Sequence, residues 1–273
     1  MRCIHRLLLA VLLVMVPLAL APLPGSAAPQ DNQRVGPSTL VVLTYNIRHG
    51  QGTDGQVDLK RIAEVIEASG AHVVALQEVD NETARTDGVD QARVLAELLH
   101  MDHHAFGPAI DFQGGQYGNA ILSRYRIDET ENIRLPQVNA GEARAALTAR
   151  IRLPDDRTFT LVATHLDHRD EANRLAQIDR INRRFSDDAR PVILAGDMNA
   201  EPGTRELVTL TEHWERACED DPAFTAPAEA PTVRIDYIFV RPADRWEVRD
   251  ATVIEEPLAS DHRPLRVTLQ LRN

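Results

Sequence analysis

Residues 192–203 read VILAGDMNAEPG, an aliphatic run that stops at two polar side chains, Asp197 and Asn199. Such a run is typical of a buried β-strand. Residues two apart in extended chain project the same way, so both side chains are expected on one side of the strand end. Taken singly, a carboxylate in this position is more often a helix cap or a turn residue than part of a site. The other strand ends of the chain decide between these alternatives.

Four other strand ends have the same character. In each of them an aliphatic run stops at Asn, Glu, His or Asp: TYN (44–46), LQE (76–78), ATH (163–165) and SDH (260–262). Sites collect at strand ends along one edge of a sheet, because the scaffold holds the side chains rigidly. Five ends of the same polarity, dominated by hard oxygen ligands, are difficult to explain as caps. The sequence therefore predicts a functional site built from these strand ends.

The composition limits the class of protein. Of the 273 residues, 43% are hydrophobic and 26% charged, and the formal net charge is −11. These values exclude a disordered chain, a collagen-like fibre and a many-pass membrane protein. The length fits one large domain or two small ones, and no linker divides the chain after residue 38. An acidic total argues against a broad phosphate-neutralising surface for nucleic acid, but it permits a small phosphate site.

The first 28 residues have the three parts of a secretory signal peptide. Arg2 and Arg6 form a positive n-region, residues 7–21 are apolar, and residues 25–28 (GSAA) offer small side chains for signal peptidase. A retained membrane anchor is the alternative, but the apolar run is shorter than the roughly 20 residues of a spanning helix. We expect cleavage near residue 28, a secreted or periplasmic protein without a membrane span, and a flexible lead-in over 29–38. Cys218 would then be the only cysteine, so no internal disulfide is expected.

Beyond residue 38, strand-like and helix-like patterns alternate. Strands are expected over 40–45, 72–76, 118–123, 145–153, 159–165, 192–195, 234–240, 246–254 and 264–271. Asp58 and Asp90 can each cap a helix, and a third helix is expected over 171–185. The residues expected to face inward on the second helix are Val94, Leu95, Leu98 and Leu99. The Pro- and Ala-rich stretch 222–231 is expected to be a surface loop. Hairpins mixed with strand–helix units predict two mixed sheets packed together with helices outside.

The polar strand ends lie within seven segments that resemble the endonuclease/exonuclease/phosphatase family: TYNIRHG (44–50), ALQEVD (75–80), YGNAILSR (117–124), THLDHR (164–169), GDMNAEPG (196–203), RIDYIF (234–239) and SDHRPL (260–265). They occur in the family's order. DNase-like nucleases, inositol-polyphosphate phosphatases and bacterial sphingomyelinases share this metal-dependent fold. The resemblance implies an α/β protein, a four-layer α/β/β/α sandwich of two mixed sheets flanked by helices over residues 39–273, with the site at one sheet edge.

The resemblance also implies a divalent metal ion. Hydrolysis of a phosphate ester needs charge neutralised on the non-bridging oxygens, an in-line water and help for the leaving oxygen. Glu78 offers the hard oxygen that Mg²⁺ prefers. By resemblance Glu78 is the main ligand, with Asn46 and Asp261 near the same ion; Mn²⁺ and Ca²⁺ are alternatives, and the number of ions stays open. If Asn46 is not a ligand, it is a turn residue whose amide bonds its own backbone. If Glu78 is not a ligand, it is an exposed charge at a strand end.

The resemblance assigns His262 as the general base or as a group that stabilises the transition state, with Asp236 orienting it. An imidazole needs a partner on its second nitrogen to fix its tautomer, and an Asp inside an apolar strand needs a partner because its burial is costly. By resemblance, Asp197 and Asn199 lie beside the nucleophilic water and the phosphate, and His165 binds phosphate or serves the leaving group. The choice between Asp197 and His262 as the base stays open.

Further candidates for substrate contact are Asp167, His168, Asn119 and Arg144. Arg144 has the geometry for a bidentate phosphate clamp, or else it is a surface charge. The other histidines are expected to be surface or satisfied residues: His49, His72, His100, His103, His104 and His213.

No run of Lys or Arg with interleaved aromatics marks a nucleic-acid track. No long aromatic hairpin of the kind used by membrane-acting sphingomyelinases is evident in the sequence. We therefore expect an exported Mg²⁺-dependent hydrolase of phosphate esters, a phosphodiesterase on a small or lipid-linked substrate, acting as a monomer. Two alternatives stay open: a secreted nuclease, and a catalytically silent binding module on the same fold.

Overall fold

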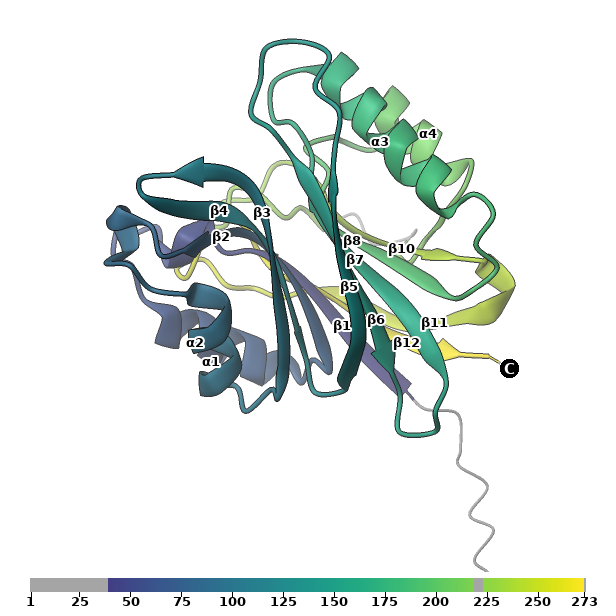
Figure 1. The fold of residues 1–273 in the computed structure, drawn as a ribbon, viewed down its shortest axis with the longest axis horizontal. Coiled ribbons are helices and arrows are strands. Elements are labelled where there is room, and N and C mark those ends of the chain that lie inside the picture. Colours follow the sequence, from purple (N-terminus) through teal and green to yellow (C-terminus); the bar gives the residue numbers. More distant parts are fainter. Residues whose placement is uncertain (1–38, 219–222, 273) are drawn as a thin grey trace, which may run out of the picture. The chain divides into compact units, whose positions relative to one another are not determined.

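The computed structural model describes residues 39–218 and 223–272. The expected signal peptide (1–28) and lead-in (29–38) lie outside the described residues. Within them, the strands form two mixed sheets that carry helices on their outer faces (Figure 1). No helix of these two ranges combines the length and the apolar character that crossing a bilayer requires.

The first sheet of the described residues has six strands in the order β11–β12–β1–β2–β4–β3. β1 and β2 run parallel, and the other neighbours are antiparallel. The strands are β1 Thr39–Asn46, β2 Val73–Asn81, β3 His103–Phe112, β4 Gly115–Ser123, β11 Trp246–Val253 and β12 Leu265–Leu271.

The second sheet of the described residues also has six strands, in the order β5–β6–β7–β8–β10–β9. Here β7 and β8 are the parallel pair, and the other neighbours are antiparallel. The strands are β5 Arg126–Arg134, β6 Ala145–Arg152, β7 Thr158–His165, β8 Val192–Asp197, β9 Glu215–Arg216 and β10 Asp236–Arg241.

Three of the helices begin at aspartate caps. The side chains of Asp58, Asp90 and Asp170 each accept a hydrogen bond from the backbone N–H three residues on, which satisfies a donor that the first turn leaves free. This confirms the caps predicted at Asp58 and Asp90. The helices are α1 Leu59–Ser69, α2 Gln91–Leu98, α3 Glu171–Phe185 and α4 Arg205–Thr211, with 3-10 turns η1 Arg48–Gly50, η2 Ala84–Thr86 and η3 Ala243–Arg245.

Apolar cores separate four layers. The inner faces of the sheets share one core, in which Val42 and Ala75 of the first sheet meet Ala163 and Ala195 of the second. α1 and α2 pack on the outer face of the first sheet, and α3 and α4 on the outer face of the second (Figure 1). The fold is therefore the four-layer α/β/β/α sandwich that the sequence predicted.

The strand pattern missed β3 and β5, which lie at the ends of their sheets. β5 has the sequence RIDETENIR and exposes most of its charged side chains. Edge strands carry charges because an apolar edge invites pairing with other chains. Their sequences therefore lack the aliphatic runs by which the inner strands are recognised.

Two local expectations were wrong. Leu98 was expected to face inward, but it is 42% exposed at the end of α2. The stretch 222–231 is not wholly a surface loop, because Thr225, Ala226 and Ala228 are buried. They are covered because the loop is bonded to the segment before β12: the Ala228 N–H donates to the Asp261 carbonyl at 2.7 Å.

The strand register brings the polar strand ends to one edge of the molecule. Asn46 ends β1 opposite Gln77 of β2, and His165 ends β7 opposite Asp197, which ends β8. Asp236 begins the antiparallel β10 and also lies opposite Asp197. The parallel pair at the centre of each sheet therefore delivers its carboxyl ends to the same edge.

Candidate active site

Asn46 connects the two sheets at this edge. Its side chain is fully buried, and its Nδ2 donates to Glu78 Oε1 and to Asp197 Oδ2, both at 3.2 Å. Its Oδ1 accepts the backbone N–H of Arg48 at 3.1 Å, which leaves the NH₂ group facing the carboxylates. Asn46 therefore holds two carboxylates in place, and its oxygen is engaged by the backbone.

Glu78 reaches the site from a distorted part of β2. The β2–β4 register shifts between Leu76 and Val79, as in a β-bulge, which re-aims a side chain. Glu78 has a φ of 57°, a left-handed conformation that is uncommon outside glycine. Burial raises the pKa of the Glu78 carboxyl; the Asn46 hydrogen bond lowers it, and the Asp261 charge raises it again.

Positive φ recurs around the same edge. Arg48, His49 and Asn199 have φ values of 46°, 45° and 47°. Backbone strain of this kind costs on the order of 1–3 kcal/mol per residue and persists where the surrounding structure enforces it, often at functional sites. At Asn199 it ends the extended chain, so the side chain donates to the Leu166 carbonyl at 3.0 Å instead of continuing the direction of Asp197 as expected.

Asp197 lies at the centre of the cluster. It is 1% exposed, and its Oδ2 lies 3.4 Å from His165 Nε2 and 3.7 Å from His262 Nε2. Its Oδ1 accepts the Asn199 backbone N–H at 2.9 Å. Burial and the charge of Asp236 raise the pKa of Asp197 to about 7.

His262 and Asp236 are paired as the sequence predicted. His262 Nδ1 donates to Asp236 Oδ2 at 2.8 Å, and Asp236 Oδ1 is buried with no partner among the described residues. Thr225 Oγ1 accepts the N–H of Asp236 at 3.3 Å and so fixes the start of β10. Burial lowers the pKa of His262, but the Asp236 carboxylate more than offsets it and raises that pKa to about 10.

The pKa of His165 is shifted in the opposite direction to that of His262. Its ring is buried, and its Nδ1 has no hydrogen-bond partner among the described residues. Burial and the positive charges of Arg144 and His262 hold the pKa of His165 well below its usual value. The two imidazoles that face Asp197 therefore favour different protonation states, which is how acid and base roles are commonly divided.

Asp261 forms the outer rim. Its Oδ2 lies 3.6 Å from Arg48 Nε, and its side chain is 42% exposed. The preceding Ser260 donates from Oγ to the Asn46 carbonyl at 2.7 Å, which fixes this loop against β1. Asp261 therefore lies near enough to Glu78 for its charge to raise that residue's pKa.

The donor set fits a divalent cation. The raised pKa of Glu78 reflects a partly buried carboxylate with too little positive charge around it, and a hard cation would supply that charge. Asp197, Asp236 and His262 also offer ligand atoms within 4.8 Å of one another, with Nε2 as the imidazole nitrogen that Asp236 leaves available. Glu78 and the partly exposed Asp261 are the candidates that the family resemblance indicates for the ion.

The remaining candidates for substrate contact have different surroundings in the structure. Asp167 is fully buried and accepts the N–H groups of the turn before α3, so it acts as a turn residue. Asn119 donates to the Ala145 carbonyl at 2.9 Å and joins the sheets. Arg144 is 3% exposed, with Nη1 2.9 Å from Glu142 and Nη2 3.2 Å from His168 Nδ1.

Sequence reasoning missed two residues beside the site. His49 was expected to be a surface or satisfied residue, but its Nδ1 is buried without a partner among the described residues. Tyr117 is buried, and burial and the charge of Glu78 raise its pKa. His49 lies in the TYNIRHG segment and Tyr117 in the YGNAILSR segment. Their position in these two segments was the feature of the sequence that could have placed them at the site.

Comparison with known proteins agrees with this geometry. A model of the endonuclease/exonuclease/phosphatase family matches residues 43–262. The uncharacterised protein YbhP of Escherichia coli (strain K12) is 30% identical over 246 residues, which cover 84% of this chain and 96% of YbhP.

Two solved structures have the same fold. An endonuclease/exonuclease/phosphatase from Beutenbergia cavernae DSM 12333 superposes with a TM-score of 0.71 at 28% identity, covering 85% of this chain and 72% of that one. A mannosyl-6-phosphatase from Bacteroides thetaiotaomicron VPI-5482 gives a TM-score of 0.70 at 20% identity, covering 84% and 99%. The chain belongs to the endonuclease/exonuclease/phosphatase family, whose members are metal-dependent hydrolases of phosphate esters.

Proposed function

We propose that the chain is an exported, Mg²⁺-dependent hydrolase of phosphate esters that prefers a phosphodiester on a small or lipid-linked substrate. The observation that carries this proposal is the environment of Asp197, a buried carboxylate between two histidines and joined through Asn46 to Glu78. A buried carboxylate whose pKa is raised by burial and a specific charged neighbour is a candidate functional group.

Each residue has a role in this proposal. Glu78 and Asp261 hold the cation, which when bound neutralises charge on the phosphate oxygens. His262 uses Nδ1 to donate to Asp236 and presents Nε2 toward the phosphate as a hydrogen-bond donor. We assign Asp197, whose Oδ2 lies 3.4 Å from His165 Nε2 and 3.7 Å from His262 Nε2, as the group that accepts the proton of the attacking water.

The charges around the site support a small substrate. Each of the guanidinium groups of Arg48, Arg85 and Arg144 faces a carboxylate, respectively that of Asp261, Asp80 and Glu142. A nuclease that grips duplex DNA neutralises several phosphates with cations. Paired cations offer little net charge for this purpose.

Exposed apolar side chains on the loops of the same edge support a lipid-linked substrate. Val57 follows β1, Val138 lies between β5 and β6, Phe224 precedes β10, and Leu258 precedes β12; their exposed fractions are 46%, 58%, 48% and 43%. If these side chains form one contiguous patch, it would suit contact with lipid or another apolar surface.

An activity panel tests the proposal. Turnover of bis-p-nitrophenyl phosphate, p-nitrophenyl phosphate, phospholipid vesicles and plasmid DNA is measured with Mg²⁺, Mn²⁺, Ca²⁺ or EDTA. We expect metal-dependent turnover, with kcat/KM highest on a small phosphodiester or a phospholipid. Glu78→Gln is expected to lose roughly a thousandfold, whereas Glu67→Gln, at an exposed position of α1, is the matched control and should stay within twofold.

Two outcomes decide between the alternatives. Efficient DNA cleavage that falls steeply with salt would favour a secreted nuclease. No turnover on any substrate by a folded protein would favour a binding module.

Export and oligomeric state need separate measurements. Export rests on the three-part pattern of residues 1–28, and the intact mass of protein recovered from the periplasm or medium should correspond to a chain that begins near Ala28 or Pro29. Recovery of full-length chain in the membrane fraction would contradict export. Size-exclusion chromatography with light scattering tests the expected monomer.

A further inference from the structure

The loop that joins β5 to β6, residues 135–144, ends at an arginine that the proposed reaction does not use. The Leu135 N–H donates to the Arg144 carbonyl at 3.0 Å and closes the base of this loop. The Arg144 side chain is 3% exposed, and its Nε is buried without a hydrogen-bond partner among the described residues. Its positive charge acts on the Glu78 carboxyl of the first sheet and on the His165 ring of the second. Arg144 therefore lies between the two walls of the candidate site.

Asn173, in the first turn of α3, holds this loop from outside the site. Its side chain is fully buried, and its Oδ1 accepts the N–H groups of Val138 and Asn139, both at 2.8 Å. Its Nδ2 donates to the Asn139 carbonyl at 3.3 Å and to Asp167 Oδ2 at 3.2 Å. A side-chain amide accepts two hydrogen bonds and donates two, so this amide uses its full capacity. It joins the β5–β6 loop to the turn that precedes α3.

Gln177 repeats this arrangement one turn further along α3. Residues four apart share a helix face, and Gln177 is also fully buried. Its Nε2 donates to the Pro136 carbonyl at 3.4 Å, and its Oε1 accepts the Asp167 N–H at 2.9 Å. Like Asn173, it therefore connects the loop with the turn. We call these two residues the amide clasp.

The two connected segments also contact each other beside the site. Gly141 of the loop lies so close to the turn that a Cβ in its place would collide with Asp167 Oδ2. Arg144 Nη2 lies 3.2 Å from Nδ1 of His168, which belongs to the turn. The loop and the turn therefore form one unit, and the position of Arg144 depends on how this unit is attached to α3.

Polar contacts, rather than apolar packing, hold the middle of the loop. Val138 is 58% exposed, and the clasp bonds the backbone on both sides of it. An arginine at the base of such a loop keeps a fixed position only while these bonds hold. A fixed charge is valuable in catalysis, because it needs no rearrangement when negative charge develops on the reacting group.

We propose that Asn173 and Gln177 are positioning residues of the hydrolase, which hold Arg144 between the two walls of the site, where the negative charge of the transferring phosphate develops. This inference rests on the proposed function. It adds two residues that lie outside the cluster around Asp197.

The test is a double-mutant cycle in kcat on bis-p-nitrophenyl phosphate with Mg²⁺. Arg144→Gln is expected to lower kcat roughly a hundredfold. Asn173→Ala and Gln177→Ala should each lower it about tenfold with KM within about twofold, because the affected charge develops after substrate binding. Asn173→Ala combined with Arg144→Gln should be no slower than Arg144→Gln alone, since the clasp acts through Arg144. Multiplicative losses would overturn the proposal.

Asn182→Ala is the matched control. Asn182 is a buried amide on the same helix, but it bonds Trp214 Nε1 at 2.8 Å and the Thr209 carbonyl at 3.4 Å, on the side of α4. Urea unfolding should show this variant destabilised as the clasp variants are, and its kcat should stay within about twofold of the wild type. An equal loss of kcat in Asn182→Ala would mean a general effect of stability and would overturn the positioning role.

Gly141→Ala tests the same idea without removing an amide. Its Cβ pushes the loop away from Asp167, so a similar loss of kcat and the same non-additivity with Arg144→Gln are expected. Metal-dependent turnover by the wild type, with kcat unchanged in the clasp variants and in Gly141→Ala, would overturn the clasp and leave the proposed function standing. No metal-dependent turnover of any substrate by the wild type would overturn both.

Discussion

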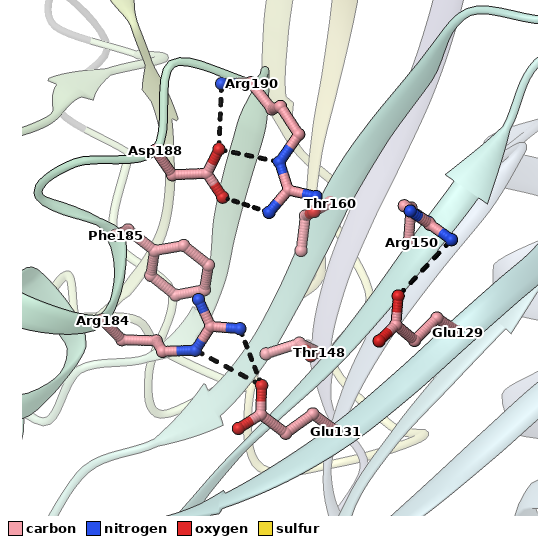
Figure 2. A pocket seen from close by; sticks show the side chains of 9 residues that line it. All are labelled: Glu129, Glu131, Thr148, Arg150, Thr160, Arg184, Phe185, Asp188 and Arg190. Carbon is pink, nitrogen blue, oxygen red and sulfur yellow. Dashed lines mark hydrogen bonds and ion pairs between the residues drawn. The ribbon is translucent and has the colours of Figure 1, made fainter.

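Charged side chains are concentrated in two regions of this molecule, and the two regions differ in how their carboxylates are paired with positive groups. A hollow of about 110 Å³ lies against β5, β6 and β7, near the start of β7 and thus toward the end of that strand away from His165 (Figure 2). There Arg190 bonds Asp188 at 2.7 Å, Arg184 bonds Glu131 at 2.8 Å, and Arg150 lies 3.4 Å from Glu129. Every carboxylate of the hollow has its own guanidinium. At the candidate active site, Glu78, Asp197 and Asp236 share one amide and two histidines.

The difference appears in the pKa values. The hydrogen bonds from Arg190 hold the pKa of Asp188 below its usual value. Burial and the charge of Asp236 raise the pKa of Asp197 to about 7. Ion pairs in the hollow satisfy their own charges and leave nothing for a ligand, whereas the active-site cluster has more carboxylates than positive groups. The number of charged residues in a depression therefore says less about function than whether the charges are already paired.

The largest effect should come from removing the central carboxylate. Asp197→Asn is expected to lower kcat/KM by about a thousandfold or more, because it removes the proposed proton acceptor. Asp188→Asn makes the same chemical change in the hollow and should stay within twofold. Steady-state kinetics on bis-p-nitrophenyl phosphate with Mg²⁺ compares them. Equal losses in the two variants would remove the distinction between the regions.

A smaller effect is expected for the His262–Asp236 pair. His262→Ala and Asp236→Ala should each lower turnover roughly a hundredfold or more. The double variant should be little worse than either single one, because residues that act as a unit are not additive. The kcat values of the four proteins form the test. Fully multiplicative losses would mean that the two residues act independently.

The stability of the two regions should respond to pH with opposite sign. The folded-state pKa of Asp197 lies above its unfolded value of about 4, so its contribution is present below that value and is lost as pH rises through about 7. The pKa of Asp188 is depressed, so its contribution is present above the unfolded value and is lost as pH falls through the folded one.

Urea unfolding in EDTA between pH 5 and pH 8 measures this contrast. Asp197→Asn is expected to gain stability over the wild type as pH rises, by up to a few kcal/mol at about 1.4 kcal/mol per pKa unit. Asp188→Asn should be less stable than the wild type over the whole range, by less than about 1 kcal/mol. A gain for Asp197→Asn that is constant with pH would show that its carboxylate does not titrate there.

The pairing of His262 with Asp236 was predicted from the family resemblance, and the burial of an aspartate within an apolar strand, which needs a partner, supported it. The sequence also predicted that β1, β2, β7 and β8 end at one edge, because each strand stops at a polar residue. These features follow from single segments. The structure adds the 2.8 Å contact and the edge shared by the two sheets.

Features that depend on segments far apart in sequence were not predictable in this way. Arg85 contacts Asp80 of β2 and Phe112 of β3, and these two strands meet only because both pair with β4. Glu78 reaches the site through an irregular β2–β4 pairing, which no strand pattern encodes. The opposite pKa shifts of His165 and His262 depend on which charges the fold places beside each ring.

The smallest effect is expected from the ion pair of Arg184 and Glu131. Both side chains are partly exposed, at 35% and 49%, so solvent screens their attraction and the coupling should be about 0.2–1 kcal/mol. A double-mutant cycle of Arg184→Gln and Glu131→Gln by urea unfolding measures it, and the coupling should shrink at high salt. Turnover should not change in any of the three variants, because the pair is complete in itself and lies on β5 and the C-terminal end of α3, which contribute no residue to the candidate site. A change in kcat would mean that the hollow is energetically linked to the site, and then pairing of charges alone would not tell a structural cluster from a functional one.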